Sequence, residues 1–211
     1  MATRSNTPDL GPMFVDFIFA LAAAQVFLNL GDRPNTVSSA GLAHLGLALV
    51  VIVLSFLGYH RGTVAKNRTR EFQFFNKELL QFTVDVAIVS AYFVLVVYTE
   101  GRPQRPGAHG ASPSAVAETV ILAIVFLLYV VWDIFEVILA KSDSARNDAR
   151  YHRRLSVAFA PVFVLGALAV CLTNPTSTSS VIAIDVAAVV AVVLYRLLGD
   201  HKKSLSAFVG H

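Results

Sequence analysis

Six long apolar runs constrain this sequence more than any other feature. Each run is about 17–25 residues long, the length that an α-helix needs to cross a hydrocarbon core of about 30 Å. Runs of this length lack the alternation of barrel strands, and a helix satisfies its own backbone hydrogen bonds in lipid. The sequence therefore predicts an all-α polytopic membrane protein in which residues 1–211 form a single transmembrane domain. The expected spans are 13–30, 40–59, 80–98, 115–139, 155–172 and 181–198.

Composition supports this fold class and argues against a soluble domain. Only 15% of the residues are charged, whereas 55% are apolar, and the mean hydropathy is +0.64. A soluble domain carries about 25% charged residues. The charges in this chain are instead gathered between the apolar runs.

Lys and Arg residues concentrate on one side of the expected bundle, and short loops rich in these residues stay in the cytoplasm. Fourteen of the 17 Lys and Arg residues fall near the N-terminus, between spans two and three, between spans four and five, or at the C-terminal end. Arg196 is counted with the C-terminal end. We therefore expect cytoplasmic N- and C-termini in a multi-pass protein of a bacterial inner (plasma) membrane. The net charge of +3 then reflects basic loops that face anionic headgroups, not a nucleic-acid partner.

Several ionisable side chains lie inside the expected spans, where each costs about 2.5–3.5 kcal/mol on insertion scales. Asp16, Asp85, Asp133 and Glu136 are expected in the cytoplasmic third of the bundle. Asp185 stands apart near the outside, and His44 and Glu118 lie near the outer rim.

Two interpretations of the four clustered carboxylates remain open. We expect no intramembrane Lys or Arg to neutralise them. In one interpretation they anchor basic loops, Asp16 through His60 or Arg61 and Glu136 through Arg153 or Arg154. In the other they form a cation-attracting vestibule or a proton relay.

The first span has two chemically different faces. Asp16 shares one stripe with small residues that suit close helix contact. Leu21, Gln25 and Leu28 lie on another stripe, about 140° away at 100° per residue. This second stripe is suited to line a narrow and mostly dry pore. Alternatively, Gln25 forms a hydrogen bond to a neighbouring helix.

The sequence contains no recognisable enzyme motif, so we predict that the protein is not an enzyme and holds no cofactor. His60, His152 and His201 lack metal-ligand spacing. The single Cys171 excludes an intrachain disulfide and a Cys-based metal cluster. We accordingly predict no metal site.

The segment FVDFIFALA at 14–22 resembles the opening of the lysosomal and endosomal potassium channel family, in particular its bacterial six-helix branch. The end of the second span, SFLGYHR at 55–61, is similar to that family's stretch from Ser-Phe to His. Asn76 resembles the Asn that opens the family's third helix. The similarity covers the first three helices, and Leu10 and Val15 stand where the family has Arg and Ser.

The resemblance implies a homotetramer that conducts monovalent cations, potassium above all, with the first helices lining the pore. Leu21 then occupies the position of the family's apolar constriction, beside the pore-lining Gln25 and Leu28. The resemblance also implies a structural polar cluster of Asp16, His60 and Asn76 that braces this helix.

Three functional hypotheses follow from the sequence. The first is an oligomeric cation channel with its constriction at Leu21. The second is a proton-coupled transporter of a small solute that uses Asp85, Asp133 and Glu136, although no span is broken by Gly or Pro near its middle. The third is a non-conducting accessory or effector subunit. A fourfold assembly around the first helix favours the channel, whereas a monomer with a cavity at the membrane midplane favours the transporter.

Overall fold

The computed structural model describes residues 10–32, 38–65, 77–98 and 114–209, which contain six α-helices. Each predicted span falls within one of these helices, and all six are long and apolar enough to cross a membrane. The prediction of six candidate transmembrane helices is thus confirmed. The helices are α1 (Leu10–Asp32), α2 (Ser39–Ala65), α3 (Lys77–Tyr98), α4 (Ala115–Leu139), α5 (Asp143–Thr173) and α6 (Thr178–Val209).

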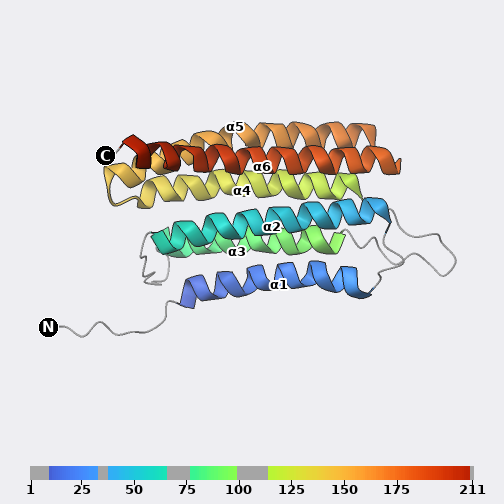
Figure 1. The fold of residues 1–211 in the computed structure, drawn as a ribbon, viewed down its shortest axis with the longest axis horizontal. Coiled ribbons are helices and arrows are strands. Elements are labelled where there is room, and N and C mark those ends of the chain that lie inside the picture. Colours follow the sequence, from blue (N-terminus) through green and yellow to red (C-terminus); the bar gives the residue numbers. More distant parts are fainter. Residues whose placement is uncertain (1–9, 33–37, 66–76, 99–113, 210–211) are drawn as a thin grey trace.

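The helices pack in layers (Figure 1). α2 and α3 lie in the middle, α1 packs against one side of this pair, and α4, α5 and α6 lie on the other side. α3 contacts α4 and α2 contacts α6 across the second boundary. The first turn of α1 and the last turn of α6 lie at the same end of the bundle. We call this the basic end, because the Arg-rich first turns of α5 also lie there.

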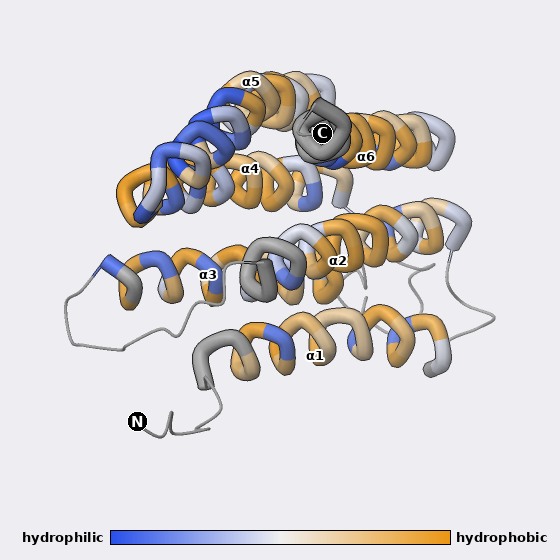
Figure 2. Tube along the Cα trace, turned by 60° about the vertical axis from the view of Figure 1, so that its left-hand side comes forward, coloured by the Kyte–Doolittle hydropathy of each residue, from blue (hydrophilic) through white to orange (hydrophobic). Residues whose placement is uncertain are grey.

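The start of α5 differs from the prediction. The predicted spans leave the whole of 140–154 as a loop, but α5 begins at Asp143. The Ser142 side chain accepts a hydrogen bond from the backbone N–H of Ala145 (3.2 Å), and Asp143 adds an acidic residue to the first turn. Both features stabilise a helix N-terminus. The basic residues of this segment are therefore carried on a helix, as the hydrophilic colouring of its first turns shows (Figure 2).

Aromatic side chains fill much of the boundary between the helices. Phe126 stacks on Phe163 with ring centroids 3.8 Å apart, and its edge meets Tyr195. Phe19 of α1 contacts Phe56 and Tyr92 in the middle layer. Large apolar side chains on the outer faces remain exposed, as expected for helices that face lipid.

A short turn connects α5 and α6. Asn174 ends α5 in the left-handed region (φ 42°), and its N–H donates to the Val170 carbonyl at 2.8 Å. Asn tolerates this backbone conformation better than most residues. The turn returns the chain at the end of the bundle opposite the basic end.

Candidate functional site

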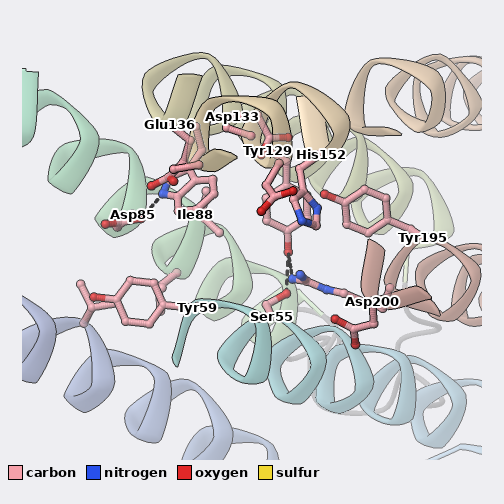
Figure 3. A pocket seen from close by; sticks show the side chains of 18 of the residues that line it. Ser55, Tyr59, Asp85, Ile88, Tyr129, Asp133, Glu136, His152, Tyr195 and Asp200 are labelled. Atoms are coloured by element: carbon pink, nitrogen blue, oxygen red, sulfur yellow. Dashed lines mark hydrogen bonds between the residues drawn. The ribbon is translucent and has the colours of Figure 1, made fainter. Parts of the chain in front are cut away.

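A cavity of about 410 Å³ lies between the helix layers toward the basic end, and all six helices contribute to its lining. α1 supplies the apolar residues Val15 and Phe19, whereas the other helices supply mainly polar and aromatic groups. Figure 3 shows these groups converging from α3, α4 and α6. Exposed residues at the start of α5 and the end of α6 form the mouth, among them Asp148 and Asp200.

The three carboxylates that the sequence singled out on α3 and α4 meet in this cavity. Asp85, Asp133 and Glu136 are all buried there. Asp133 and Glu136 share one face of α4 because they are three residues apart. Together with Asp148 and Asp200, they bring five carboxylates to the lining.

Neutral donors hold the buried carboxylates in place. Trp132 Nε1 donates to Asp85 Oδ1 at 2.6 Å, and Gln81 Nε2 donates to Glu136 Oε1 at 2.7 Å. The Ser156 hydroxyl donates to Asp133 Oδ2. Such bonds fix the direction of each carboxylate. The donors are neutral, so they bring no positive charge to balance an ionised carboxylate.

Arg196, which the charge count placed at the C-terminal end, lines the same cavity as the carboxylates. It lies within the candidate span of α6. Its Cζ lies 5.6 Å from the ring centroid of Tyr129 and 5.5 Å from that of Tyr195, within cation–π range. Its Nη2 donates to the Tyr129 hydroxyl at 3.5 Å.

A tyrosine network extends from Arg196 into the middle layer. The Tyr129 hydroxyl lies 2.5 Å from both the Ser55 and the Tyr92 hydroxyls. Gly58 leaves room for the Arg196 guanidinium, since a Cβ at position 58 would collide with it. This network is not predicted from the sequence. The signal that could have revealed it is the face of α4 that carries Tyr129, Trp132, Asp133 and Glu136 at helical spacing.

Asp16 belongs to a different environment. It is half-buried on α1, next to the cavity-lining Val15, and lies close enough to the exposed His60 for an electrostatic interaction. The expected partner Asn76 lies outside the described residues. The polar cluster implied by the family resemblance therefore remains a prediction.

The stripe proposed to line a pore lies on an outer face of α1. Leu21 is 47% exposed and Leu28 is 56% exposed. Gln25 Nε2 donates to Asn29 Oδ1 at 2.8 Å, so this bond lies within α1 and does not reach a neighbouring helix.

Asp185 lies away from the cavity, where it meets His44 and Glu118 near the opposite end. Each of these residues is predicted from the sequence to lie near the outside, but their contact with one another is not predicted.

No protein family, curated protein or solved structure matches this chain. The resemblance to potassium channels therefore stands on the quoted residues alone. Function must be inferred from the geometry of the site.

Proposed function

We propose that the protein is a proton-coupled membrane transporter that binds a small organic cation in the cavity. The main observation that supports this proposal is a cavity within one chain, where Asp85, Asp133 and Glu136 meet beside aromatic rings. This is the transporter hypothesis of the sequence analysis, with the site now defined by its lining.

The lining favours a positively charged solute. Five carboxylates stand against one arginine and one histidine, Arg196 and His152. Tyr59 and Trp132 add aromatic surface, and aromatic faces attract organic ammonium groups. A volume of about 410 Å³ also falls in the range of roughly 300–1,000 Å³ that is usual for small-molecule sites.

Buried carboxylates provide a means of coupling to protons. A bare charge is costly inside a membrane protein, so a carboxylate there favours either a bound proton or a bound cation. Competition between the two at Asp85 or Glu136 makes cation release depend on proton binding. The basic end faces the cytoplasm under the charge-asymmetry rule, so the mouth of the cavity opens to that side.

Trp132 offers a direct test of binding, because it is the single tryptophan of the chain and lines the cavity. Titration of the purified protein with tetraethylammonium should change the tryptophan emission in a saturable way. Glu136→Gln removes one carboxylate charge and should raise the dissociation constant about tenfold or more, the factor that corresponds to 1.4 kcal/mol.

Asp143→Asn is the matched control, since Asp143 is a carboxylate with a 96% exposed side chain at the start of α5. This variant should bind like the wild type. An emission that stays constant during titration, or an equal loss of affinity in both variants, would show that the cavity does not bind this class of solute.

A second candidate function is the oligomeric cation channel. One observation favours it: α1 lies at the edge of the bundle with Leu21 and Leu28 uncovered, which leaves this face available to line a shared pore.

A further inference from the structure

Three buried ionisable side chains meet near the end of the bundle opposite the basic end. His44 of α2 lies against Glu118 of α4, and its Nδ1 is 2.9 Å from Asp185 Oδ2 of α6. One ligand-type atom from each residue lies within 4.8 Å of the other two. The residues are far apart in the sequence, so only the packing of α2 and α6 beside α4 brings them together.

These groups are almost fully shielded from solvent. His44 is 1% exposed, Glu118 is 3% exposed and Asp185 is 1% exposed. Beyond their contacts with one another, the side-chain nitrogens of His44 and the carboxylate oxygens of Glu118 and Asp185 have no hydrogen-bond partner among the described residues. Buried polar atoms are normally hydrogen-bonded, so three buried side chains whose polar atoms have no hydrogen-bond partner outside their own cluster are suited to bind an ion.

Charge balance is consistent with a divalent cation bound between these groups. Two ionised carboxylates and a neutral imidazole carry a net charge of about −2, and a protonated imidazole offsets only half of it. A divalent cation brings the total to zero, which removes most of the cost of burying the two anions. Glu118 lies in the first turn of α4, so the positive end of that helix dipole also favours its ionised form.

We infer that His44, Glu118 and Asp185 bind a resident divalent transition-metal ion of the Zn²⁺ type. One imidazole nitrogen and two carboxylate oxygens are ligands that Zn²⁺ accepts, and three protein ligands leave one position of a tetrahedron open. This site is separate from the cation cavity and does not depend on the proposed transport function.

The position of the site indicates a structural role. Ala40, Ala115 and Val181 form an apolar layer that lies one turn closer to the end of the bundle. This layer covers the three ligands, so an ion held there would exchange with solvent only slowly, over the long incubation that removal by a chelator requires. The ion would tie α2, α4 and α6 together at the end where each of these helices begins.

Metal content and thermal stability test the inference. Protein purified from a zinc-supplemented culture should hold about one Zn²⁺ per chain, and a strong chelator should lower its melting temperature until Zn²⁺ is added back. Asp185→Asn and Glu118→Gln keep the side-chain shape and should reduce Zn²⁺ affinity by more than the roughly 10–100-fold lost when an outer-shell partner is removed. Glu136→Gln, a buried carboxylate at the other end, should keep the wild-type metal content.

Co²⁺ provides a readout that does not rely on stability. Wild-type protein loaded with Co²⁺ should show visible absorption bands of a bound, low-coordinate ion, and His44→Gln should change or abolish them. A well-folded wild-type protein that holds no metal, has no Co²⁺ bands and melts at the same temperature with and without chelator would overturn the inference. His44, Glu118 and Asp185 would then be held together by shared protons and not by a metal ion.

Discussion

At the scale of single residues, Gly58 controls the position of the Arg196 guanidinium in the cavity. Gly58→Ala should push the Arg196 guanidinium off the rings of Tyr129 and Tyr195, because the new Cβ would occupy its place. The Arg196 side chain would then lose its contacts with these rings, which are worth about 0.5–2 kcal/mol, and this loss should offset the gain of about 0.8–1.0 kcal/mol from replacing Gly by Ala in a helix. The melting temperature in detergent should therefore be lower than that of a Gly→Ala variant that moves no side chain.

Gly46→Ala is the control on the same helix, since a Cβ at Gly46 meets no other group within 4 Å. It should melt at or above the wild-type temperature. Equal melting temperatures for the two variants would show that Arg196 does not depend on the space beside Gly58.

At the scale of helices, α5 runs from one end of the bundle to the other, so labelling of its two ends tests the orientation of the bundle in the membrane. Thr176→Cys, just after α5, should react with an impermeant maleimide in intact cells that carry Cys171→Ser. Asp143→Cys, in the first turn of α5, should react only after permeabilisation. This result follows from the clustering of Lys and Arg at the basic end. The reverse pattern would place the basic end and the mouth of the cavity outside the cell.

At the scale of the whole molecule, the sequence predicts the elements better than the site. Six apolar runs are enough to predict six helices, because length and composition alone decide whether a helix can cross lipid. The helical spacing of Asp133 and Glu136 places them together, and the fold brings Asp85 to the same cavity.

The remaining features depend on contacts between distant helices. Arg196 looks like a cytoplasmic charge in sequence, and its contact with Tyr129 depends on the position of α6 beside α4. His44, Glu118 and Asp185 likewise show no motif spacing, since each comes from a different helix.

Transport in proteoliposomes tests the central proposal most directly. An acid-inside pH gradient should drive tetraethylammonium into the vesicles above its outside concentration, and a protonophore should abolish this accumulation. Asp85→Asn combined with Glu136→Gln should also abolish it, whereas Leu21→Asn should leave it unchanged. If the pH gradient has no effect and Leu21→Asn instead raises potassium flux, α1 lines a pore, the protein is a channel and the transporter proposal is wrong.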